Sequence, residues 1–79
     1  MQVKLITPEK TLFEGAANYV QVPGLLGELG VMPNHEPFIS LLKAGTVGIE
    51  SSGSARQEFA VTGGVAQIVH DNVTLLVEA

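Results

Sequence analysis

The residues most able to do chemistry lie in one segment, residues 24–37, with the sequence GLLGELGVMPNHEP. Its glycines, Gly24, Gly27 and Gly30, are spaced three apart. A phosphate-binding loop needs the pattern G-x-G-x-x-G or ends in G-K-[ST], and it opens a helix whose N-terminus receives the anion. Neither pattern is present and no helical periodicity follows, so the sequence predicts no nucleotide site here.

The same segment holds His35 and Glu36, one of the two histidines beside one of the eight acidic residues. The pair does not begin a zinc-binding H-E-x-x-H motif, because Ile39 occupies the position of the second histidine. Two prolines flank the pair, which argues against a helix. We therefore expect no metal and no cofactor. The simplest interpretation of His35 is a turn residue that hydrogen-bonds backbone, and the alternative is a contact with a partner protein.

The composition excludes several classes of function. Only four residues are basic and they are scattered, against eight acids, giving a formal charge of −4. A nucleic-acid-binding protein needs a basic stripe, so nucleic acid is not an expected partner. Cysteine is absent, which excludes disulfides and thiolate sites. No apolar run is long enough for a membrane span, and the first residues resemble neither a signal nor a transit peptide. We expect a soluble protein of a reducing compartment.

The elements that must position the 24–37 segment read as strands. Alternation places Val3 and Leu5 on one face of a strand over 2–6, and Val20 and Val22 on one face of a strand over 17–22. The run 38–42 is too short for its periodicity to separate strand from helix. Further strands are expected at 12–15, 29–32, 46–50, 56–61, 65–69 and 73–77, with turns at Thr7–Lys10, Ser51–Ser54 and His70–Asn72.

These short strands predict an all-β protein, a small flattened β-sandwich of two mostly antiparallel sheets with about ten strands. All 79 residues form one domain. Phe13, Phe38 and Phe59 are expected in its core, because so small a domain has few other large side chains. A chain of this length is marginally stable alone. With 46% hydrophobic and 15% charged residues, it is expected to use part of its surface for a partner.

Three blocks occur together in order: ITPEKTLFEG, VPGLLGELGVMPNHEPF and FAVTGGVAQIVHDNVTLL. With these blocks the chain resembles, over essentially its whole length, the N-terminal β-sandwich domain of the epsilon subunit of bacterial F-type ATP synthase. The mitochondrial counterpart is called delta. Members of this family usually have a glycine before the histidine of the central block, where this chain has Asn34. Asparagine tolerates the left-handed backbone region, so we expect the turn to be kept.

The resemblance implies a non-catalytic subunit of the central stalk. Such a rotor subunit links gamma to the c-ring and couples proton flow to ATP synthesis, and it lies on the cytoplasmic face of the bacterial inner membrane as a peripheral part of the F1 sector. Many members continue into a C-terminal two-helix domain, which is absent from this sequence. Inhibition of ATP hydrolysis and nucleotide binding by that domain are therefore not implied here.

The resemblance also implies contact residues. By the family pattern, Glu28, Leu29, His35 and Glu36 face the c-ring, and Thr7 lies toward gamma. Read without the resemblance, Glu28 is a solvated loop acid. The alternative function is a stand-alone adaptor that adds a peptide strand to an exposed sheet edge, for which residues 73–77 are the candidate strand.

Overall fold

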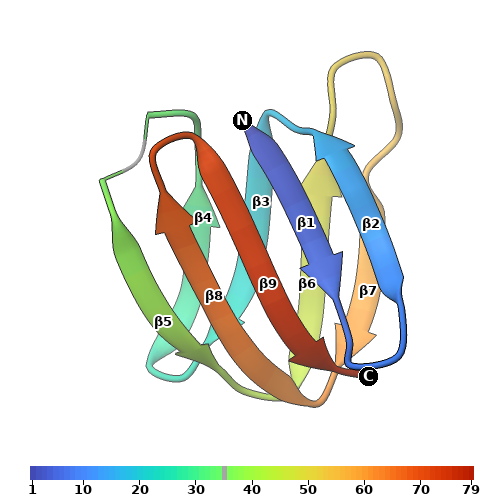
Figure 1. Ribbon diagram of the computed structural model, residues 1–79, viewed down its shortest axis with the longest axis vertical. Helices are drawn as coiled ribbons and strands as arrows, with labels where there is room; N and C mark the ends of the chain where they lie inside the picture. The colour runs from blue at the N-terminus through green and yellow to red at the C-terminus, as the bar shows by residue number, and fades with distance from the viewer. Residues whose placement is uncertain (35) are drawn as a thin grey trace.

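The computed structural model describes residues 1–34 and 36–79, and in this part of the chain it contains strands and no helix (Figure 1). The all-β prediction is confirmed, with nine strands where about ten were expected. Within the described residues there is no helix of the length and hydropathy that crossing a membrane requires. The strands are β1 (Gln2–Ile6), β2 (Thr11–Ala16), β3 (Tyr19–Gly24), β4 (Gly27–Val31), β5 (Phe38–Leu42), β6 (Gly45–Glu50), β7 (Gln57–Val61), β8 (Gly63–Val69) and β9 (Asn72–Glu78).

The strands form one continuous sheet in the order β2-β1-β9-β8-β5-β3-β6-β7, and β4 pairs with β3. Every pairing is antiparallel except that of β1 with β9, which is parallel. The two halves of the sheet meet at one pair of residues, Gly24 of β3 and Leu42 of β5. At this joint the sheet turns over, so that β5, β8, β9 and β1 lie in front of β3, β6 and β7 in Figure 1. The two expected sheets are thus the halves of one curled sheet.

The core lies between the two layers and is filled by alternate residues of the strands. The faces predicted from alternation are confirmed at Val3, Leu5, Val20 and Val22, all of which are buried. No polar or charged residue of the described chain is buried, so the interior is entirely apolar. The other buried hydrophobic residues are Ala17, Val31, Leu42, Val47, Ile49, Val61, Ala66, Ile68, Val73, Leu75 and Val77.

The expectation that all three phenylalanines lie in the core is wrong for Phe38, whose side chain is 40% exposed. It is the first residue of β5, at the end of the strand away from the joint at Leu42, where β5 pairs with β8 and not with β3. Phe13 and Phe59 are half-buried and pack edge to face, with their ring centroids 6.4 Å apart. They join β2 to β7, the two strands at the ends of the sheet order.

Two further expectations about strands are decided by pairing. Residues 38–42, undecided between helix and strand, form β5, because all five pair with β8. Residues 73–77 are the candidate edge strand of the alternative adaptor function, and the pairing contradicts that alternative. They lie within β9, which pairs with β1 on one side and with β8 on the other. An internal strand has its backbone groups satisfied and cannot accept an added peptide.

Gly64 is the position where the fold depends most clearly on glycine. Its φ is +150°, and a Cβ there would overlap the backbone carbonyl of Leu76 on β9. We predict that Gly64→Ala lowers the free energy of unfolding by about 2 kcal/mol or more, because the backbone must move. The neighbouring Gly63 provides the control, since its added Cβ would lie in ordinary contact, 3.6 Å from the backbone carbonyl oxygen of Leu42. Gly63→Ala should change the stability by less than about 1 kcal/mol. Urea unfolding of both variants measures the difference, and equal values would contradict the prediction.

Candidate functional site

The first part of the candidate site is the hairpin of β3 and β4. Its two-residue turn consists of Leu25 and Leu26, with Gly24 paired to Gly27. Gly27 has a φ of +147°, a conformation that favours glycine. Leu26 is fully exposed at the tip. A large apolar side chain that contributes nothing to the core is available for contact with a partner.

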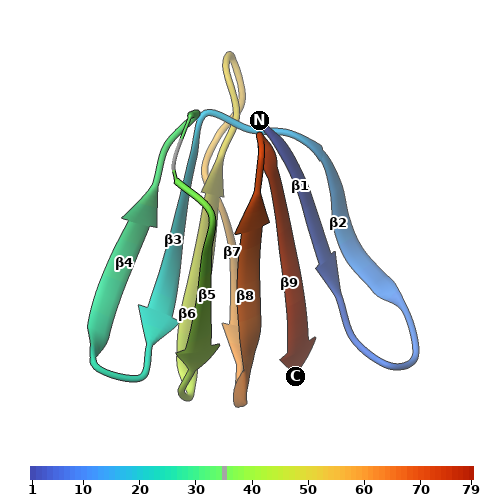
Figure 2. The same ribbon diagram turned by 60° about the vertical axis from the view of Figure 1, so that its left-hand side comes forward.

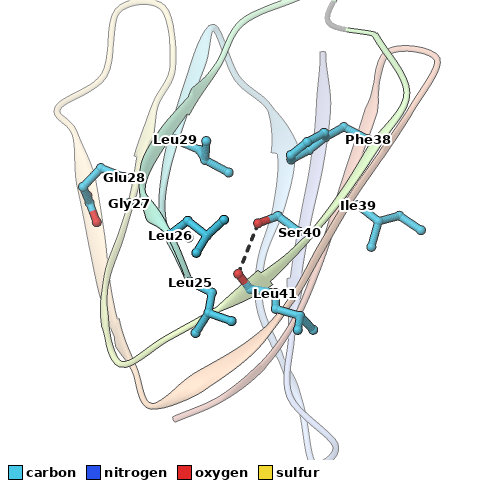
Figure 3. Close-up of a pocket in the computed structure, with 10 residues that line it drawn as sticks. Leu25, Leu26, Gly27, Glu28, Leu29, Phe38, Ile39, Ser40 and Leu41 are labelled. Carbon is cyan, nitrogen blue, oxygen red and sulfur yellow. Dashed lines mark hydrogen bonds between the residues drawn. The ribbon is translucent and has the colours of Figure 1, made fainter.

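Glu28 and Leu29, both predicted to face the c-ring, lie on opposite faces of β4 because neighbouring strand residues alternate. Glu28 is exposed and points away from the molecule in Figure 3, whereas Leu29 points toward β5 and packs against the core. Of the two, Glu28 is therefore the one whose side chain is directed outward.

Between β4 and β5 the curled sheet is open, because β5 pairs with β3 at only one position. The resulting β4–β5 opening has a volume of about 420 Å³. Leu26 and Leu29 enter it from one side and Phe38 and Ser40 from the other (Figure 3). Ser40 donates its hydroxyl to the carbonyl oxygen of Leu41 at 3.1 Å. The opening is lined by Gly24, Leu25, Leu26, Gly27, Glu28, Leu29, Phe38, Ile39, Ser40 and Leu41.

The second part of the candidate site is the turn from β4 to β5. Asn34 adopts the left-handed conformation with a φ of +68°. Its backbone N–H donates to Asp71 Oδ1 at 3.1 Å, which attaches this turn to the β8–β9 hairpin. The other oxygen of Asp71 lies 3.6 Å from the amino group of Met1. His35 lies outside the described residues, and Glu36 is exposed.

The structure does not bring all predicted contact residues together. Glu28 is at the hairpin end of β4, and the turn containing Glu36 is at its opposite end (Figures 1 and 2). Thr7 lies in the turn between β1 and β2, at the same end of the molecule as the β3–β4 hairpin. Its hydroxyl accepts the backbone N–H of Lys10 at 3.1 Å. Thr7 thus has a local role in closing its own turn.

Sequence reasoning missed a polar network on the outer face of β3, β4, β6 and β7. Glu28 Oε1 accepts from Gln21 Nε2 at 3.2 Å, and Gln21 Oε1 accepts from Arg56 Nη2 at 2.9 Å. Arg56 also donates to Glu50 at 2.8 Å and to Glu58 at 3.1 Å. In the sequence, the one indication of this network is that the alternation of β3 places Gln21 on the outer face.

Arg56 is the centre of this network. Its hydrogen bonds to Glu50 and then Glu58 raise the pKa of the guanidinium above its ordinary value. The Arg56 guanidinium is therefore a lasting positive charge on this face, since its deprotonation would require a still more alkaline solution.

Nothing in the described part of the chain suggests bond chemistry. No three metal-ligating side chains come together there. The β4–β5 opening has few polar groups, and these do not converge as a nucleophile and base would have to. The site offers the exposed Leu26, the apolar β4–β5 opening, a turn that is hydrogen-bonded to Asp71, and the polar network around Arg56. These features suit binding to another protein.

A family model described as the ATP synthase delta/epsilon chain β-sandwich domain matches residues 1–79. The chain belongs to this family. The ATP synthase epsilon chain of Brevibacillus brevis is 41% identical over 99% of this chain, and that of Desulfosudis oleivorans is 37% identical over 100%. In both cases the match spans 59% of the relative's length.

Two solved structures share the fold of this chain. A chain of the Euglena gracilis mitochondrial ATP synthase, solved as OSCP/F1/c-ring, matches with a TM-score of 0.90 and 19% identity, over 98% of this chain and 49% of that one. A chain of the Tetrahymena thermophila mitochondrial ATP synthase, from its central stalk and c-ring, matches with a TM-score of 0.84 and 17% identity. That match covers 99% of this chain and 63% of the other.

The attachment of the β4–β5 turn to Asp71 can be tested in the free chain. We predict that Asp71→Ala speeds amide hydrogen exchange at Asn34 by about 3- to 10-fold, since one exposed hydrogen bond of roughly 1 kcal/mol is lost. Asp71→Asn is the matched control, because it keeps an oxygen acceptor and removes the same ion pair with Met1. Exchange at Asn34 should stay within about 2-fold of wild type in this variant. Amide exchange at Asn34 is measured by NMR in the three proteins. Equal exchange rates in wild type and Asp71→Ala would refute the attachment of the turn to Asp71.

Proposed function

We propose that this chain acts as a central-stalk rotor subunit of a proton-translocating F-type ATP synthase. It joins gamma to the c-ring, couples proton flow to ATP synthesis and performs no catalysis itself. It lies peripherally on the cytoplasmic face of the bacterial inner membrane, within the F1 sector. The observation that carries this proposal is the match of the delta/epsilon family model to all 79 residues. Relatives that carry the name ATP synthase epsilon chain support it at 41% and 37% identity.

The architecture supports a mechanical role. A subunit that transmits rotation has to resist shear between the surfaces that its two partners hold. Here the strands run between the two ends of the molecule, and the loops lie at those ends (Figure 2). Relative sliding of neighbouring strands would break several backbone hydrogen bonds at once, because each pairing except that of β3 with β5 extends over three or more residues. Such a body transmits load with little internal movement.

For the c-ring contact we propose Glu28, with Leu29, His35 and Glu36, and for the gamma contact Thr7. The exposed, outward side chain of Glu28 supports its part in this surface. Leu29 can take part only through the β4–β5 opening, since it points inward. A single surface that includes both Glu28 and Glu36 has to extend along β4, about 15 Å for its five residues.

The proposal predicts two separable binding activities. The 79-residue chain should bind purified gamma. The complex should then dock onto F1-stripped membrane vesicles that contain the c-ring, and should not dock onto vesicles that lack it. We predict that Glu28→Gln weakens docking about 3- to 10-fold without affecting gamma binding, because an interfacial charge is lost. The loss should shrink as ionic strength rises.

Glu14→Gln is the matched control for charge, since Glu14 is an exposed acid on β2, at the far end of the sheet order. It should dock like wild type. If the wild-type chain bound neither gamma nor the c-ring vesicles, the rotor function would be rejected. If Glu14→Gln weakened docking as much as Glu28→Gln, total charge and not Glu28 would account for the effect.

A further inference from the structure

We propose that Gln21 and Arg56 are positioning residues for Glu28, holding its carboxylate in the orientation in which it meets a basic surface of the c-ring. This inference rests on the proposed function. It names the two residues that prepare the contact and the chemistry of the partner surface. Neither residue would itself have to touch the c-ring.

The geometry is a relay from β4 through β3 to Arg56, which lies directly before β7. Gln21, on β3, uses both ends of its amide: its Nε2 donates to Glu28 on β4, and its Oε1 accepts from Arg56. Arg56 can only donate hydrogen bonds, so it requires the Oε1 acceptor of Gln21. The Nε2 donor of the same amide is then directed at Glu28. Arg56 thus fixes which end of Gln21 faces Glu28, although it lies 35 residues away in sequence.

Arg56 is in turn held in place by the surface beneath it. It lies over Gly48 of β6, where an added Cβ would overlap the guanidinium. Its side chain is only 31% exposed. Two carboxylates, of Glu50 and Glu58, accept from Nη1 and Nε, which leaves Nη2 directed at Gln21. Three acceptors around one planar fork define the orientation of the guanidinium, which the ammonium group of a lysine would not reproduce.

Positioning matters because an exposed glutamate otherwise samples several rotamers. Fixing such a side chain on binding costs conformational entropy, and a side chain that is already fixed avoids that cost. From the described residues, the carboxylate of Glu28 accepts one hydrogen bond, at Oε1, and its second oxygen can accept from a basic partner group. The partner is inferred to be basic because the network contains three carboxylates, of Glu28, Glu50 and Glu58, and one guanidinium.

Gly48→Ala tests the relay without changing any charge. The new methyl group displaces the end of the Arg56 side chain, while the backbone of β6 can accept alanine because Gly48 has no positive φ. We expect docking to c-ring vesicles to weaken about 3- to 10-fold, with gamma binding and urea stability retained. Gly15→Ala on β2 is the control, since its Cβ would meet only ordinary contacts, at 3.7 Å from Phe13.

Gln21→Glu separates positioning from simple charge. Glutamate at this position keeps an acceptor for Arg56 but has no donor for Glu28. It also adds a negative charge, which by charge alone would strengthen binding to a basic surface. Positioning instead predicts weaker docking, by about 3-fold or more. In a Glu28→Ala background the same substitution should no longer weaken docking, because nothing remains to be positioned.

A measurement on the free chain reports the relay without any partner. In NMR spectra, the side-chain amide protons of Gln21 should exchange more slowly than those of a solvated glutamine, and Gly48→Ala should abolish the difference. The inference is overturned if Gln21→Glu or Gly48→Ala docks as tightly as wild type, or if the loss persists without Glu28. Failure of wild-type docking would reject the proposed function instead. The amide exchange would then still show whether Arg56 and Gln21 hold Glu28.

Discussion

The structure depends on the parallel pairing of its first and last strands, β1 and β9. Val3 lies opposite Val73 and Leu5 opposite Leu75, and all four side chains are buried. Without cysteine, no covalent link holds the two ends of the chain together, so this apolar seam has to do it. The seam forms only when the whole intervening chain has been looped out, which makes it costly to reach and slow to form. Once formed, it attaches the β1–β2 hairpin to the rest of its layer.

The joint between β3 and β5 has the opposite character. The single pair of Gly24 with Leu42 lets the sheet turn over, but it leaves β4 and β5 apart beyond that point. The edge of the core therefore lines the β4–β5 opening, and Phe38 is partly exposed to solvent there. The same geometry that makes two layers out of one sheet thus also exposes apolar side chains on the surface.

The sequence sufficed for features that are local. Alternation over five or six residues identified the buried faces of β1 and β3, because period two is a direct property of a strand. It did not predict that β9 would be internal or that Phe38 would be exposed, since both depend on which strands become neighbours. The link between Gln21 and Arg56, and that between Asn34 and Asp71, join residues 35 and 37 positions apart. No local pattern specifies such pairs.

In the candidate site, β4 connects two different surfaces. Its outward residue Glu28 belongs to the polar network, and its inward residue Leu29 packs against the core. A load applied to the Glu28 carboxylate would pass to β3 through Gln21 and from there to Arg56, which contacts acids of β6 and β7. The load would then be shared by four strands and not by the β3–β4 hairpin alone. For a proposed rotor subunit this is a physical advantage, because an exposed two-strand hairpin bends easily unless side chains brace it against its neighbours.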